Sequence, residues 1–77
     1  MNEYFKSKRA MYIFALTRMD GPNRADALGI SDEMYRNKRK ALTWHTRIKN
    51  VVERKHDQDT IDAMKVLDRL YKNMTDY

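Results

Sequence analysis

Residues that break helices are scarce in this chain, which has one proline and two glycines among its 77 residues. The one strong turn signal is Asp20-Gly21-Pro22-Asn23; Gly29 is a weaker stop, and residues 56–59 form a third, softer break. The chain also lacks cysteine, so its small core cannot rely on disulfides or on a Cys-ligated zinc ion. We therefore expect a single all-α domain over residues 1–77, folded as a compact bundle of three to four helices.

The three breaks leave four segments whose apolar residues recur at helical spacing. Helices are expected over residues 2–19, 23–28, 31 to about 55, and from about Asp59 onward. Asn23 and Ser31 are the expected N-caps, and Gly29 is expected to end the second helix. The third helix either runs unbroken or bends at residues 43–46, which are poor in strong helix formers. For residues 11–16 a short buried strand is the alternative, but no second strand is available to pair with it.

The net charge of +5 is concentrated in the middle of the chain. Six basic residues and no acidic residue lie between Arg36 and Lys49. Such a run is unusual on a helix stabilised by ion pairs and favours an anionic partner, with a solvated helix face as the simpler alternative. A chain without cysteine suits a reducing compartment, so we expect a cytoplasmic protein. The longest apolar run, Ala10–Leu16, is far shorter than the roughly 20 residues of a membrane span, so no membrane association is expected.

A tight turn between two helices is expected within residues 23–40. Ala25 is small where two helices must cross closely, Gly29 can adopt the positive φ of the turn, and Ile30 packs beneath it. Ser31 can cap the second helix, and Leu28 helps to hold the pair together. The stretch thus resembles the helix-turn-helix of small DNA-binding proteins, which places its second helix in the major groove. The alternative is an ordinary helix corner, because such a turn also joins helices that never touch DNA.

The resemblance implies a set of side chains that contact DNA. Base edges would be contacted by Ser31, Arg36, Asn37 and Lys40. Phosphates would be contacted by Arg24, Lys38, Arg39, Arg47 and Lys49. The acidic residues Asp32 and Glu33 lie at the start of the same helix and are expected to interact favourably with its dipole.

Apolar residues are more abundant in the first and last segments than one small bundle should need. We therefore expect a homodimer, which would let two recognition helices contact half-sites about one DNA turn apart. The expected interface lies on the last helix and comprises Ile61, Met64, Leu67, Leu70, Tyr71 and Met74. The alternative is that the first and last segments pack on each other within one chain.

Little in the sequence indicates catalysis, a cofactor or a metal. The chain has no cysteine nucleophile and no glycine-rich phosphate loop. Its two histidines, His45 and His56, lack the partners of a zinc site. Trp44, the one tryptophan, is expected in the core or in an interface. We therefore expect neither an enzyme nor a cofactor.

Taken together, these features predict a small basic helix-turn-helix protein that binds double-stranded DNA. It would act as a transcriptional regulator or as the DNA-recognition subunit of a larger assembly. The alternative is a helical protein-binding module or inhibitor, similar to the accessory proteins of phages. Such a module would dock on an acidic protein partner through its basic and apolar surfaces.

Overall fold

The computed structural model describes residues 7–75, which form five α-helices. In chain order they are α1 (Lys8–Arg18), α2 (Gly21–Leu28), α3 (Asp32–Arg36), α4 (Lys38–Val52) and α5 (Gln58–Thr75). This part of the chain contains no β-strand, so the expected all-α class is confirmed and the strand alternative for residues 11–16 is wrong. The expected start of the first helix, near residue 2, lies outside the described residues. None of the five helices combines the length and the apolar character that crossing a membrane requires.

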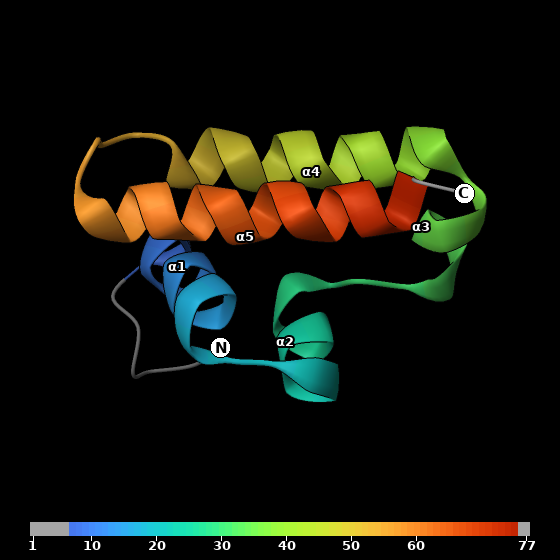
Figure 1. Cartoon of the computed structure of the whole chain (residues 1–77), viewed down its shortest axis with the longest axis horizontal. Coiled ribbons are helices and arrows are strands. Elements are labelled where there is room, and N and C mark those ends of the chain that lie inside the picture. Colours follow the sequence, from blue (N-terminus) through green and yellow to red (C-terminus); the bar gives the residue numbers. More distant parts are fainter. Residues whose placement is uncertain (1–6, 76–77) are drawn as a thin grey trace.

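The two longest helices, α4 and α5, form an antiparallel pair that runs along the length of the molecule (Figure 1). α1 packs against both members of this pair, and α2 packs against α1. The short α3 packs against α4 and α5. An extended stretch leads from the end of α2 to α3 and separates these two helices (Figure 1). α1 and α5 contact each other, so the first and last segments pack together within one chain.

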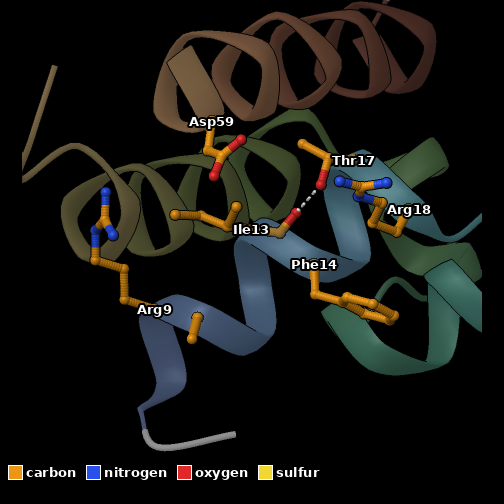
Figure 2. A pocket seen from close by; sticks show the side chains of 7 residues that line it. Arg9, Ile13, Phe14, Thr17, Arg18 and Asp59 are labelled. Atoms are coloured by element: carbon orange, nitrogen blue, oxygen red, sulfur yellow. Dashed lines mark hydrogen bonds between the residues drawn. The ribbon is translucent and has the colours of Figure 1, made fainter. Parts of the chain in front are cut away.

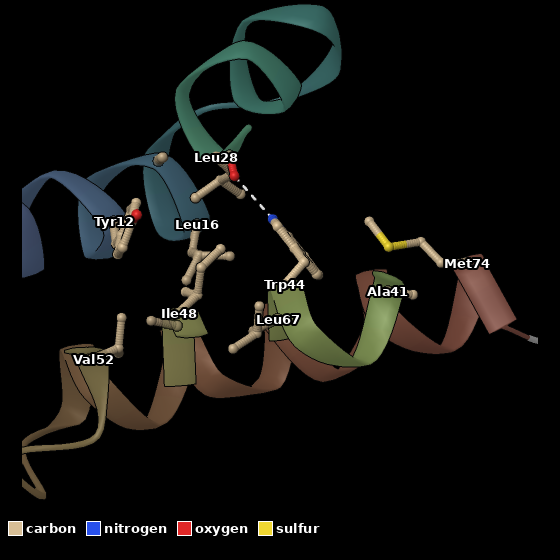
Figure 3. Close-up of a cluster of buried hydrophobic side chains, with 11 residues drawn as sticks. Tyr12, Leu16, Leu28, Ala41, Trp44, Ile48, Val52, Leu67 and Met74 are labelled. Carbon is tan, nitrogen blue, oxygen red and sulfur yellow. Dashed lines mark hydrogen bonds between the residues drawn. The ribbon is translucent and has the colours of Figure 1, made fainter. Parts of the chain in front are cut away.

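The core lies where α1 meets the α4–α5 pair (Figure 3). Its largest fully buried side chains are Trp44, Leu16, Ile48, Leu67, Met74 and Val52. The indole Nε1 of Trp44 donates a hydrogen bond of 2.9 Å to the carbonyl oxygen of Leu28, at the end of α2. This bond satisfies the indole N–H inside the core and attaches the end of α2 to α4. The expectation that Trp44 belongs to the core or an interface is confirmed, with the core as its place.

The second helix ends as expected but starts earlier. Gly29 terminates α2 in the left-handed conformation, with φ of 70°, and its backbone N–H donates to the carbonyl oxygen of Asp26. The helix begins at Gly21, with Asp20 at the N-cap position, so the expected N-cap Asn23 lies inside the first turn. Pro22 fits this first turn because a backbone N–H at that position has no partner within the helix.

The predicted third helix is interrupted at Asn37, which separates α3 from α4. The Asn37 side-chain oxygen accepts hydrogen bonds from the backbone N–H groups of Arg39 and Lys40, at 3.0 and 3.3 Å. Asn37 is thus the N-cap of α4, and these local bonds compete with continuation of the helix. The alternative of a bend at residues 43–46 is wrong, since α4 is continuous there and buried Trp44 fixes this turn against the core.

A hydrogen-bonded cluster attaches α1 to the connection between α4 and α5. The Arg9 guanidinium donates to the carbonyl oxygen of Val52 at 3.1 Å and to the buried Thr60 hydroxyl at 2.6 Å. The Asp57 carboxylate accepts from the backbone N–H and the hydroxyl of Thr60, at 2.9 and 2.7 Å. Asp57 therefore caps the start of α5, and the helix begins at Gln58, close to the expected start near Asp59.

The face of α5 predicted as a dimer interface packs mainly inside the chain. Leu67 and Met74 are fully buried within the single chain, so neither can contact a second copy. Three of the other four predicted residues are half-buried, and only Ile61 is exposed, at 42%. The reason is that α5 packs against both α4 and α1, which together cover its apolar side.

Candidate nucleic-acid interface

The exposed surface of α4 is basic in the first turn and again near the C-terminal end of the helix. The helix contains no acidic residue, and its first turn follows directly from the Asn37 cap. All its basic side chains are exposed, and we call them the basic face of α4: Lys38, Arg39, Lys40, Arg47 and Lys49. The basic face includes four of the five residues predicted to contact phosphate. Its fifth member, Lys40, was predicted to contact bases. The fold thus brings them onto one helix.

The residues of the basic face differ in how strongly they are engaged by neighbouring acids. Lys40 donates a hydrogen bond to the Glu33 carboxylate, and Lys49 lies 3.9 Å from that of Glu53. The hydrogen bond from Lys40, and then its charge, lower the pKa of the Glu33 carboxyl. Arg39 and Arg47 form no ion pair with a carboxylate of the described residues. The two guanidinium groups are therefore the cations of this surface best placed to bind an external anion.

A shallow pocket lies beside the basic face, between α3 and α4. It is lined by Ser31, Glu33, Met34, Arg39, Lys40, Thr43, Trp44 and Arg47. Three of these residues are basic and one is acidic, and two carry hydroxyl groups. Guanidinium, ammonium and hydroxyl groups are the donors that phosphate oxygens accept from most often in protein–DNA contacts. The chemistry of the pocket therefore fits a phosphate group.

The residues predicted to contact bases do not share one continuous helix. Ser31 is the exposed N-cap residue of α3, and Arg36 is exposed at the end of that helix of five residues. Asn37 uses its side-chain oxygen to cap α4, and Lys40 is paired with Glu33. No Cα atom of α2 lies within 8 Å of a Cα atom of α3. The two segments expected to form a helix-turn-helix pair are therefore apart, because α3 packs on the α4–α5 pair.

Arg24, the fifth residue predicted to contact phosphate, has a structural role. It is half-buried, and its guanidinium lies within 3.3 and 3.4 Å of the carbonyl oxygens of Ala15 and Leu16, to which it donates hydrogen bonds. These carbonyls belong to the last turn of α1, which has no further helical partners for them. Arg24 therefore holds α2 against α1 and does not belong to the basic face of α4.

The sequence analysis missed a second basic stripe, which lies on α5. Lys65, Arg69 and Lys72 are exposed and are spaced by four and three residues, so they project from the same side of the helix. Lys65 also lines a pocket together with Lys49 of α4, which places one end of the stripe beside the basic face. The signal was present in the helical spacing, but the excess of acids after residue 57 concealed it.

A third pocket, between α1 and the start of α5, is also shallow and is less suited to an external ligand. It is lined by Arg9, Ala10, Ile13, Phe14, Thr17, Arg18 and Asp59 (Figure 2). The Arg9 guanidinium already donates to Val52 and Thr60, and the Thr17 hydroxyl donates to the carbonyl oxygen of Ile13 at 2.7 Å. Two of the polar groups of this pocket, those of Arg9 and Thr17, thus serve the fold.

The histidines are not grouped with other metal-binding side chains. His45 Nε2 lies 2.8 Å from an Asp68 carboxylate oxygen, and its ring packs at 4.6 Å from that of Tyr71. His45 therefore helps to join α4 to α5. Residues 7–75 contain no cluster of three or more His, Cys, Asp or Glu side chains that could hold a metal ion.

Comparison of the chain with protein-family models, with curated proteins and with solved structures finds no match. The function must therefore be inferred from the geometry of the site itself.

Proposed function

We propose that this protein binds double-stranded DNA through the basic face of α4. The observation that carries the proposal is a helix of 15 residues whose charged side chains are all basic and all exposed. DNA presents a dense row of phosphates, and binding through lysine and arginine releases condensed counterions. A helix without acidic residues limits repulsion along that row.

The basic face is long enough to contact more than one phosphate of DNA. Arg39 and Arg47 are separated by eight residues, which at a rise of 1.5 Å per residue corresponds to about 12 Å along the helix axis. Phosphates line both edges of the major groove along its length. The guanidinium groups of Arg39 and Arg47 pair with no carboxylate of the described residues, so each can contact a phosphate at a different point along the groove.

The biological role that we propose is that of a transcriptional regulator or of a DNA-recognition subunit in a larger assembly, in the cytoplasm. The proposal does not require a dimer, since two of the six residues predicted for the interface are fully buried in the single chain. It does not require a helix-turn-helix pair either, because α4 supplies the basic surface without α2.

The proposal is tested by measuring binding to a random duplex at several salt concentrations. The double variant Arg39→Ala/Arg47→Ala should bind more weakly, and the slope of log K against log salt should fall by about two units, one for each lost phosphate contact. The matched control is Lys8→Ala/Arg18→Ala, which removes the same charge from exposed positions on α1. Its slope should stay close to that of the wild type.

Two results would count against the proposal. Equal losses in the two double variants would mean that only total charge matters and that α4 has no special role. Absence of duplex binding at low salt would favour the acidic protein partner instead. For such a partner Leu42, which is 50% exposed on α4, would provide an apolar contact.

A further inference from the structure

The exposed side of α4 has three parallel rows of side chains. Successive residues of an α-helix are rotated by about 100° around the axis. On that basis Arg39, Thr46 and Asn50 fall within about 40° of one another and form the central row, directly opposite buried Ile48. The central row thus points straight away from the core. Its first member, Arg39, lies in the first turn of α4, where its long side chain can extend to a phosphate at the edge of the groove, whereas Thr46 and Asn50 lie further along the helix.

The other basic residues lie to either side of this central row. Lys38 and Lys49 lie about 90° to one side, towards α5, and Lys40 and Arg47 lie about 90° to the other side. A helix in the major groove has this distribution of contacts, with base edges in front of it and a phosphate backbone on each flank.

We infer that α4 itself enters the major groove, where Asn50 contacts an adenine and Thr46 contacts a neighbouring base. This inference rests on the proposed DNA-binding function and adds to it the helix and the residues that read sequence. An asparagine amide can bond the N6 and N7 atoms of adenine together, and a threonine can contact a base edge or the thymine methyl group.

The two side chains are available for such contacts. Both are exposed, and neither makes a side-chain hydrogen bond to another described residue. Thr43, one turn before Thr46 and two turns before Asn50, differs because its hydroxyl donates to the carbonyl oxygen of Arg39 at 3.0 Å. A base contact by Thr46 or Asn50 therefore breaks no bond of the folded protein.

The alternative reader, Asn37, is poorly placed for the same task. Its side-chain oxygen already accepts from two backbone N–H groups, so it cannot accept from adenine N6 without uncapping α4. α3 has five residues, which is little more than one turn, and it lies against the α4–α5 pair. A continuous helix with an outward central row is found in α4.

The test begins by selecting preferred duplexes from a randomised pool and then measures affinity for the selected site and for its single-base variants. We expect a preferred site that contains an adenine whose replacement weakens wild-type binding by about 5- to 100-fold. Asn50→Ala should lose the preference at that position alone. The control Asn73→Ala removes an exposed asparagine from α5 and should keep the preference. Circular dichroism melting should show that both variants fold.

The outcomes separate the inference from the proposed function. Binding to all duplexes without an enriched sequence would overturn the inference and leave DNA binding intact. Unchanged selectivity in both Asn50→Ala and Thr46→Val would do the same. Absence of duplex binding by the wild type would overturn the proposed function and this inference together.

Discussion

Replacing Asn37 by alanine should destabilise the fold by about 1 kcal/mol while leaving the proposed base selectivity unchanged. The change removes the oxygen that accepts from the backbone N–H groups of Arg39 and Lys40, at 3.0 and 3.3 Å. Loss of an N-cap side chain costs about 0.5–2 kcal/mol. The site is exposed, so water replaces part of each bond, and we expect a value near the middle of that range.

The measurement is thermal unfolding followed by far-ultraviolet circular dichroism. For a domain of this size a loss of 1 kcal/mol lowers Tm by roughly 4–8 °C. Asn37→Ser is the matched control, because serine caps a helix about as well as asparagine but cannot form the paired bonds of an amide to adenine. We expect Tm of the serine variant to stay within about a degree or two of the wild type.

The capping role and the base-contact role of Asn37 predict opposite results. As a cap, Asn37 matters for stability, and the serine variant behaves as the wild type in both assays. As a base contact, it matters for selectivity, and the serine and alanine variants both lose discrimination at one base pair. Unchanged stability of Asn37→Ala together with lost selectivity would refute the capping argument.

Three further predictions concern the fold. Trp44→Phe removes the donor to the Leu28 carbonyl and should lower the free energy of unfolding, measured in urea, by about 1–3 kcal/mol. An unchanged free energy of unfolding would mean that water replaces this hydrogen bond. Gly29→Ala should cost about 1–2 kcal/mol through backbone strain alone, since nothing lies within 4 Å of the added Cβ; Gly29→Asn should cost less. Hydrogen bonds from the hydroxyl and then from the backbone N–H of Thr60 lower the pKa of the Asp57 carboxyl below its ordinary 3.8. The ionised carboxylate therefore stabilises the folded protein fully above pH 3.8, and this stabilisation is lost as the pH falls further. The difference in Tm between wild type and Asp57→Asn should therefore narrow below that pH, and a constant difference would contradict the assignment.

Much of the fold could be predicted because strong local signals agree with tertiary packing. Gly29 ends α2 because its φ of 70° suits glycine, and Trp44 is buried because a large apolar ring with one N–H can be satisfied in the core. The break at Asn37 was missed for a physical reason. The spacing of apolar residues is the same whether an exposed asparagine lies inside a helix or at its N-cap. Only the hydrogen bonds from the following backbone N–H groups distinguish these two positions.

The candidate site could be predicted only in part. The basic face of α4 could be predicted, because the sequence from Arg36 to Lys49 contains six basic residues and no acidic residue. The separation of α2 from α3 could not be predicted, since similarity over one turn says nothing of the surface on which α3 packs. Arg24 is a similar case, because its use by the α1 carbonyls depends on the angle between two helices.

The bonds of Arg9 join residues that are 43 and 51 positions apart in the chain, whereas α4 and α5 are joined by residues 53–57 alone. Contacts between near neighbours in sequence require less loss of chain entropy, so we expect the α4–α5 hairpin to form early in folding and α1 to dock late. The basic face of α4 lies entirely on that hairpin. If α4 binds DNA as we propose, DNA present during folding stabilises the hairpin before the core is complete, and the nucleic acid acts as a folding template as well as a ligand.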